Sequence, residues 1–144
     1  MQFPIYHLTE KVSIQQITEI SMNKDTMVIV FSKNRAMQLD LCLRSFFKYC
    51  QDDLKSYDMV VLWTADNQEH KSAYYYLDYM NRNKCLFYKE RDFKDDLLWF
   101  VEDYKFTMFI VDDCVFTNNF SISKAKELLY SYDFSFHLPY TILR

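Results

Sequence analysis

Short apolar segments alternate with segments of helical periodicity along this chain, and that alternation limits the fold more than any other sequence feature. Four apolar runs predict strands, at residues 27–31, 59–63, 84–88 and 106–111. Apolar side chains at helical spacing predict helices over about 36–49, 68–80, 92–104 and 121–130. Strand–helix alternation of this kind gives parallel strands with right-handed crossovers. The predicted fold is α/β, a Rossmann-like three-layer α/β/α arrangement around a mainly parallel central sheet.

Length and composition predict one folded domain. The chain has 144 residues, half of them apolar, with 12 Tyr and 13 Phe. A chain of that size and composition buries a substantial core. No internal repeat or linker divides the sequence. We therefore expect a single domain over residues 1–144, in which residues 1–25 form an N-terminal lead with a short helix at 13–21.

Charge and cysteine usage argue against several classes of protein. The net charge is −3 and no block of Lys or Arg stands out, which speaks against nucleic-acid binding. No apolar run is long enough to span a bilayer, and the N-terminus lacks a signal-peptide pattern. The cysteines (42, 50, 85 and 114) and the histidines (7, 70 and 137) are scattered, which argues against a zinc site. Reduced thiols in a cytoplasmic protein are the expectation.

The chain contains no glycine. A glycine-rich phosphate-binding loop of the Walker or Rossmann type is therefore excluded. Any nucleotide must be held by another arrangement. The tight turns must use Asn, Asp and Lys in backbone conformations that glycine would adopt at lower cost.

Two adjacent carboxylates, Asp112 and Asp113, directly follow the apolar run 109–111. We expect this run to be a strand buried on both faces of the sheet. Unpaired carboxylates are costly to bury, and ligands of open α/β sheets bind beyond the carboxyl ends of the strands. Two hard oxygen ligands there suit Mg²⁺ or Mn²⁺, with a diphosphate supplying further oxygens. The alternative is that Asp113 caps the next segment and Asp112 is simply exposed.

The ends of the other predicted strands carry polar side chains as well. Ser32, Asp66, Glu90 and Asp112 end the four strands and should lie along one edge of a parallel sheet. This convergence favours a ligand site more than any single residue does.

Three further side chains near this edge have two interpretations each. Arg35 suits a planar fork to a phosphate, or it is a helix first-turn residue paired with an acid. Asp66 accepts hydrogen bonds from a base or ribose, or it caps the following helix. Lys94 reaches a phosphate, or it is a solvated lysine.

A family resemblance rests on several motifs taken together. The segment 28–36, followed by Leu39, Cys42, Leu43 and Ser45, resembles the opening of nucleotide-sugar glycosyltransferases with the GT-A fold, similar to glycosyltransferase family two. The segment 111–116 is similar to the Asp-x-Asp (DxD) element of that family. Residues 87–98 resemble the helix before this element, and 134–138 resembles a Phe-Ser-Leu-Arg-Leu stretch of bacterial members.

The resemblance implies a metal-dependent glycosyltransferase that transfers a hexosyl group from a nucleoside-diphosphate sugar to an acceptor. The residues implied for binding the nucleotide sugar are Ser32, Asn34, Arg35, Asp66, Lys94 and Asp112. Within this set, Asp66 contacts the base and Asp112 contacts the ribose or the metal. Asp113 is the implied principal ligand of Mn²⁺ or Mg²⁺. The resemblance assigns no catalytic residue.

Two departures from the family leave a second function open. Cys114 stands where the Asp-x-Asp element has its second Asp, and only a short segment follows, as in a truncated family member. Asp133 is the nearest remaining carboxylate, and His137 replaces an expected Arg.

The alternative function is a non-catalytic interaction module, in which Tyr74, Tyr75 and Tyr79 form a partner surface unless they pack against the helix flanks. A receiver domain fits poorly, because its acids follow the first strand.

Overall fold

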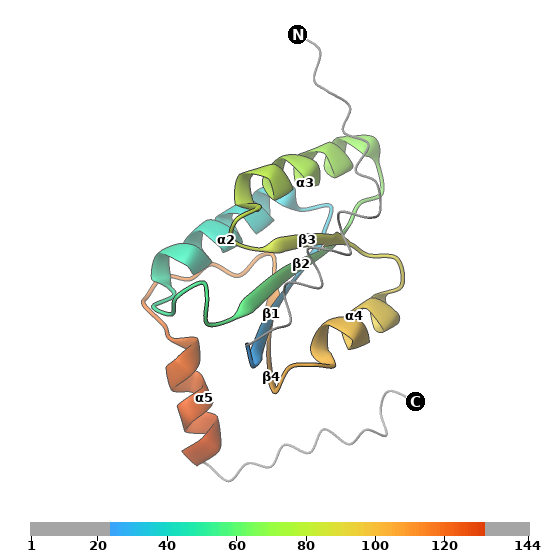
Figure 1. Cartoon of the computed structure of the whole chain (residues 1–144). Coiled ribbons are helices and arrows are strands. Elements are labelled where there is room, and N and C mark those ends of the chain that lie inside the picture. The colour runs from blue at the N-terminus through green and yellow to red at the C-terminus, as the bar shows by residue number, and fades with distance from the viewer. Residues whose placement is uncertain (1–23, 132–144) are drawn as a thin grey trace.

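The computed structural model describes residues 24–131 and contains one four-stranded parallel sheet (Figure 1). The strands are β1 (Thr26–Lys33), β2 (Asp58–Thr64), β3 (Leu86–Lys89) and β4 (Phe106–Val111), in the order β3-β2-β1-β4. The helices are α2 (Ala36–Tyr49), α3 (Gln68–Asn81), α4 (Phe93–Val101) and α5 (Ile122–Ser131). The predicted element order is confirmed, although α4 ends at Val101 instead of near residue 104.

Several predictions concern residues outside the described range. The expected helix at 13–21 lies there, as does the lead 1–25 apart from its last two residues. The segment 134–138, which includes His137, and the carboxylate Asp133 also lie outside it.

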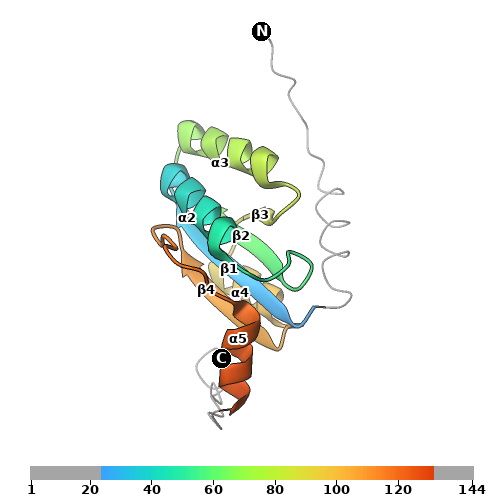
Figure 2. The ribbon, with the colours of Figure 1, turned by 90° about the vertical axis from the view of Figure 1, so that its left-hand side faces the viewer.

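Helices cover both faces of the sheet, as Figure 2 shows, and this confirms the three-layer α/β/α prediction. The central strand β1 has neighbours on both sides, so its successive side chains enter two separate apolar clusters. Val28 and Val30 pack towards α2 and α3, while Met27 and Ile29 pack towards α4. All four are at most 1% exposed. Burial on both faces explains why β1 is apolar almost throughout.

Strand β4 departs from the prediction that it is buried on both faces. It pairs with β1 alone among the described strands, so it forms an edge of the sheet. Ile110 faces the α2/α3 side and is buried, but Phe109 and Val111 are 55% and 50% exposed. The cluster under α4 takes its strand residues from β1, β2 and β3, so α4 does not cover this face of β4.

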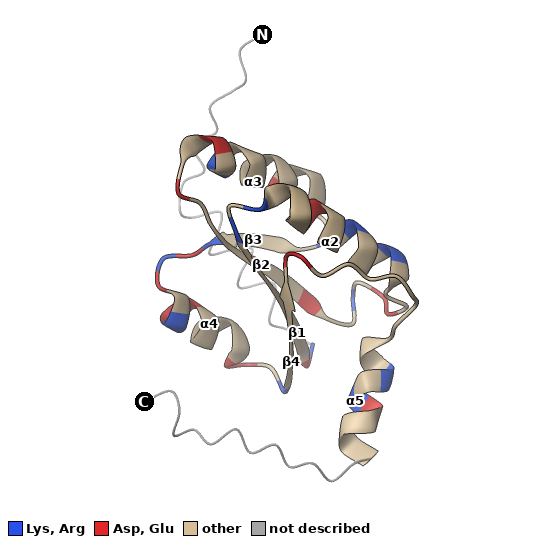
Figure 3. Ribbon diagram, turned by 180° about the vertical axis from the view of Figure 1, so that it is seen from behind, with Lys and Arg blue, Asp and Glu red and all other residues tan. Residues whose placement is uncertain are grey.

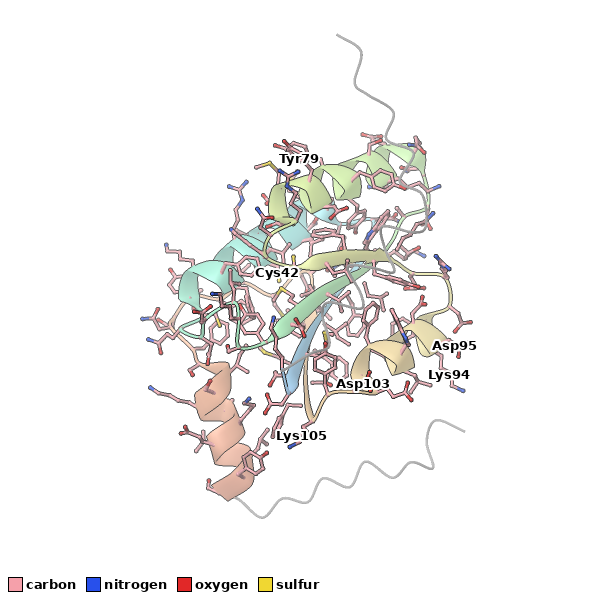
Figure 4. All side chains as sticks on the ribbon, in the orientation of Figure 1. Cys42, Tyr79, Lys94, Asp95, Asp103 and Lys105 are labelled. Carbon is pink, nitrogen blue, oxygen red and sulfur yellow. The ribbon has the colours of Figure 1, made fainter. Side chains whose placement is uncertain are left out.

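Helix α3 presents a different side to the sheet from the one predicted. Leu77 is buried as expected, but Tyr76 and Met80, predicted to face inward, are 63% and 55% exposed. Tyr74 is fully buried, so the prediction that it belongs to an exposed partner surface is wrong. It stacks on Trp63 of β2 with ring centroids 4.6 Å apart. Tyr75 and the more distal Tyr79 (labelled in Figure 4) remain at least half exposed.

Asp52, in the loop after α2, anchors the start of α5. Its carboxylate accepts hydrogen bonds from the backbone N–H groups of Ile122 (2.6 Å) and Ser123 (3.1 Å) and from the Ser123 hydroxyl. Backbone N–H groups at a helix N-terminus have no partner within the helix, so this carboxylate supplies the cap from a distant loop. Burial raises the pKa of Asp52, but hydrogen bonds with Ser123 and Ile122 outweigh it and lower the pKa overall.

We expect Asp52→Ala to lower the free energy of unfolding by about 1–2 kcal/mol, in the range of a lost N-cap. Amide hydrogen exchange should accelerate in α5 more than in β1. Because folding lowers the pKa of this carboxyl, its contribution is full at neutral pH and declines as the pH falls below about 4. Urea denaturation at pH 7 and pH 3 measures both effects. An equal loss at the two pH values would contradict the role of the ionised carboxylate.

Candidate functional site

The carboxyl ends of the four parallel strands meet around one hollow, with a volume of about 660 Å³. This volume lies in the range of small-molecule sites. Figure 3 shows the acidic segment after β4 beside the basic segment that joins β1 to α2. The residues that line the hollow are Phe31, Ser32, Lys33, Asn34, Arg35, Leu62, Thr64, Glu90, Phe93, Val111, Asp112 and Asp113.

Arg35 contacts both members of the acidic pair. Its Nη1 atom lies 3.3 Å from Asp112 Oδ1 and 3.4 Å from Asp113 Oδ2. The side chains of Arg35 and Asp113 are 51% and 60% exposed, whereas that of Asp112 is 7% exposed. One cation thus faces two anions, one of them buried. The interpretation that Arg35 pairs with an acid is confirmed, and its contact with a phosphate stays a prediction.

Asp112 is held on both carboxylate oxygens. Arg35 contacts Oδ1, and the Ser32 hydroxyl donates to Oδ2 at 2.8 Å. The Asp112 backbone N–H donates to Phe31 O, which continues the β1–β4 pairing beyond the strand. The alternative in which Asp112 is simply exposed is therefore wrong. Asp113 forms no backbone cap among the described residues, since its recorded partner there is Arg35.

The turn from β1 to α2 adopts a left-handed backbone at Asn34, with φ of 56°. Asparagine tolerates this region better than most residues, which confirms that the chain uses Asn where glycine is absent. The Asn34 amide donates to Asp66 Oδ2 at 2.6 Å, and the Asp66 backbone N–H donates to Asn34 Oδ1 at 2.9 Å. The side chains therefore clamp this turn to the end of β2.

Asp66 serves this clamp and does not cap α3. The helix cap is Asn67, whose side chain accepts from the backbone N–H of His70. The hydrogen bond from Asn34 is the main cause that lowers the pKa of Asp66, and the nearby Lys33 ammonium also lowers it. Asp66 lies beside the hollow without lining it, so its contact with a base stays a prediction.

Tyr74 is part of the site, although the sequence predicted only a partner-surface or packing role for it. Its hydroxyl lies 2.6 Å from Ser32 Oγ and accepts from the backbone N–H of Arg35 at 3.0 Å. Burial raises the pKa of Tyr74, and the hydrogen bonds with Ser32 and Arg35 oppose that rise. The sequence could have predicted that Tyr74 is buried, because it lies three residues before Leu77 and therefore shares its helix face.

Lys94 is separated from the predicted site. It is exposed on α4 (Figure 4) and does not line the hollow, whereas its neighbour Phe93 does. The rings of Phe93 and Phe31 lie 5.6 Å apart and form an apolar wall. Glu90, named from its place at the end of β3, lines the hollow as that position implies. The structure thus brings together Ser32, Asn34, Arg35, Asp112 and Asp113, and leaves Asp66 and Lys94 outside the lining.

The acidic pair fits a divalent cation only in combination with ligand oxygens. Across residues 24–131, no group of three or more His, Cys, Asp or Glu side chains is placed to hold a metal ion. Asp113 projects an exposed carboxylate, and Asp112 already has a partner on each oxygen. Cys114 is also exposed, but a thiol is a poor ligand for Mg²⁺. A diphosphate and water would have to complete the coordination shell.

Comparisons with known proteins place the chain near glycosyltransferases. No family model matches it. The bifunctional glycosyltransferase pgtA of Dictyostelium discoideum is 35% identical over 105 residues, which cover 67% of this chain and 14% of that protein. The crystal structure of S. aureus TarS superposes with a TM-score of 0.54 at 14% identity, over 74% of this chain and 20% of TarS. The resemblance to glycosyltransferases and the α/β fold expected from the sequence are confirmed.

Within the described part of the chain, no helix has the length and hydropathy needed to cross a membrane.

The strain at Asn34 gives a matched pair of variants. Asn34→Ala and Asn34→Gly both lose the hydrogen bonds with Asp66, but only alanine places a Cβ at a positive φ. We expect Asn34→Ala to be less stable than Asn34→Gly by roughly 1 kcal/mol. Urea denaturation of the two proteins measures the difference. Equal stabilities would show that the backbone at position 34 leaves the left-handed region once the clamp is lost.

Proposed function

We propose that this chain binds the nucleoside-diphosphate part of a nucleotide sugar in the hollow and takes part in transfer of a hexosyl group to an acceptor. The observation that carries the proposal is the exposed Arg35–Asp113 pair, fixed at the ends of parallel strands beside the buried Asp112. The similarity to a glycosyltransferase supports the reaction class. The chain spans 14% of that relative, so the complete reaction is itself part of the proposal.

Arg35 is the proposed phosphate ligand. Its Nη1 atom makes both contacts with the acidic pair, which leaves Nε and Nη2 without a protein acceptor among the described residues. A guanidinium presents these donors in a planar fork that matches two phosphate oxygens. Ser32 and Asn34, on the same turn, line the hollow beside it.

Asp113 is the proposed principal ligand of Mn²⁺ or Mg²⁺, with Asp112 adjacent to it. When bound, the cation would neutralise the charge that develops on the diphosphate leaving group. Asp113 is exposed enough to exchange its contact with Arg35 for a cation. Asp112, whose oxygens are both engaged, would orient Arg35 and contact the ribose or the metal.

The nucleoside is proposed to lie beside Phe31 of β1 and Phe93 of α4. Phe31 and Phe93 supply an apolar wall against which a flat base can pack. Asp66 remains the proposed base contact and Lys94 a proposed contact of the nucleotide. Both would require a ligand that extends beyond the hollow, because neither residue lines it.

The alternative function is a non-catalytic glycosyltransferase-like module that binds a partner. Tyr75 and Tyr79 of α3 are 50% and 63% exposed, as an interaction surface requires. This function needs no acceptor site and no general base.

Nucleotide binding can be tested by thermal denaturation with UDP- and GDP-sugars, with and without Mn²⁺. A ligand at 100 times its Kd stabilises the native state by about 2.7 kcal/mol, so we expect Tm to rise by several degrees. The rise should require Mn²⁺ and should be lost in Asp113→Asn. Asp103→Asn, an exposed acid before β4 at the opposite end of the sheet (Figure 4), is the matched control and should keep the rise. No rise with any donor would overturn the proposal and favour the interaction module.

Arg35 can be tested separately from the metal. Arg35→Lys keeps the charge beside Asp112 but loses the planar fork, so we expect nucleotide affinity to fall about tenfold with little loss of stability. Arg35→Ala should in addition destabilise the protein by about 1–3 kcal/mol, because it leaves Asp112 buried without its cation. Titration calorimetry and urea denaturation measure the two effects. Unchanged affinity in Arg35→Lys would remove Arg35 from the phosphate site.

A further inference from the structure

We propose that Tyr74 is a positioning residue of this site, whose buried hydroxyl fixes Arg35 and Asp112 relative to each other before any ligand binds. The inference rests on the proposed function, because it assigns a role in nucleotide binding to a residue that lies outside the hollow.

Four contacts join Tyr74, Ser32, Asp112 and Arg35 in a closed ring. Tyr74 OH and Ser32 Oγ are 2.6 Å apart, and Ser32 donates to Asp112 at 2.8 Å. Arg35 Nη1 contacts the other oxygen of Asp112 at 3.3 Å, and the Arg35 backbone N–H returns to Tyr74 OH at 3.0 Å. The ring links α3, the end of β1, the start of α2 and the end of β4.

The directions of the hydrogen bonds in this ring are determined by its chemistry. A carboxylate only accepts, so the Ser32 hydroxyl uses its single proton on Asp112. Ser32 Oγ must then accept from Tyr74, because the Tyr74 hydroxyl can donate its proton to Ser32 while its oxygen accepts from the Arg35 backbone N–H. The tyrosine hydroxyl thereby fixes the rotation of the serine hydroxyl.

Tyr74 has the rigidity that a positioning residue needs. It is fully buried, and its ring stacks on Trp63 at 4.6 Å and 16°. Tyr75 meets the same indole edge-on at 5.6 Å. A hydroxyl carried by such a packed ring has little freedom to move, so it holds the backbone of Arg35 at the point where α2 begins. Binding elements fixed in advance in this way lower the entropy cost of ligand binding.

The test compares Tyr74→Phe with Tyr57→Phe. Each substitution removes one hydroxyl from a buried tyrosine of the same apolar cluster, but within residues 24–131 Tyr57 forms no hydrogen bond with Ser32, Arg35 or Asp112. The measurements are the affinity for UDP and GDP with Mn²⁺ by titration calorimetry and the amide exchange of Arg35 by NMR. Val30, in the centre of β1, serves as the internal reference for exchange.

We expect Tyr74→Phe to weaken nucleotide binding about tenfold, which corresponds to the loss of one to two hydrogen bonds. The Arg35 amide should exchange at least about tenfold faster relative to Val30, because it has lost its acceptor. Tyr57→Phe should leave both quantities within about twofold of the wild type. A purely structural tyrosine would lower the stability of Tyr74→Phe and leave its nucleotide affinity within about twofold of the wild type.

The outcomes separate the two proposals. A wild-type protein that binds neither UDP nor GDP would overturn the proposed function and, with it, the role of Tyr74 in nucleotide binding. A wild type that binds nucleotide, together with a Tyr74→Phe variant of equal affinity, would overturn the role of Tyr74 and leave the proposed function standing.

Discussion

The buried carboxylate of Asp112 is the constraint on which the arrangement of this site depends. The residue is 5% exposed, and an ionised carboxylate in that position requires partners on both oxygens. Arg35 supplies the charge and Ser32 supplies the hydroxyl donor. Both come from the end of β1 and the turn after it, so compensating this one charge brings the segments after β1 and β4 together. The same contacts place an exposed cation and the exposed carboxylate of Asp113 at the rim of a hollow.

The sequence predicted the sheet and the convergence of its strand ends for a simple physical reason. Each apolar run is short, each intervening segment has helical periodicity, and parallel strands necessarily share one carboxyl edge. Ser32, Glu90 and Asp112 could therefore be placed together before their contacts were known. The turn at Asn34 could also be anticipated, because a chain without glycine must use another residue for a left-handed backbone. Similarity to a glycosyltransferase agrees with the resemblance read from these same segments.

The wrong predictions for α3 and β4 concern which side of each element is buried by its neighbours. Residues 74–76 are three consecutive tyrosines, so composition gives no reason to bury one of them and expose the others. The three-residue spacing to Leu77 favours Tyr74, but the rotation of α3 that stacks Tyr74 on Trp63 depends on tertiary packing. In the same way, the run Phe109–Val111 reads as buried on both faces, but its outer side depends on whether another element covers β4. The local pattern of apolar residues predicts whether a segment is a helix or a strand, but it does not show which other elements will pack against it.

The site divides into a rigid part and an adjustable part. Tyr74, Ser32 and Asp112 are each less than 10% exposed and are joined by short hydrogen bonds, so they keep their positions when the surroundings change. Arg35 and Asp113 are at least half exposed and joined only by a long contact of 3.4 Å, which has little energy in water. An arriving phosphate and its cation compete with this weak pair and not with the buried network. Binding can therefore separate Arg35 from Asp113 at low cost, while Tyr74, Ser32 and Asp112 keep their positions.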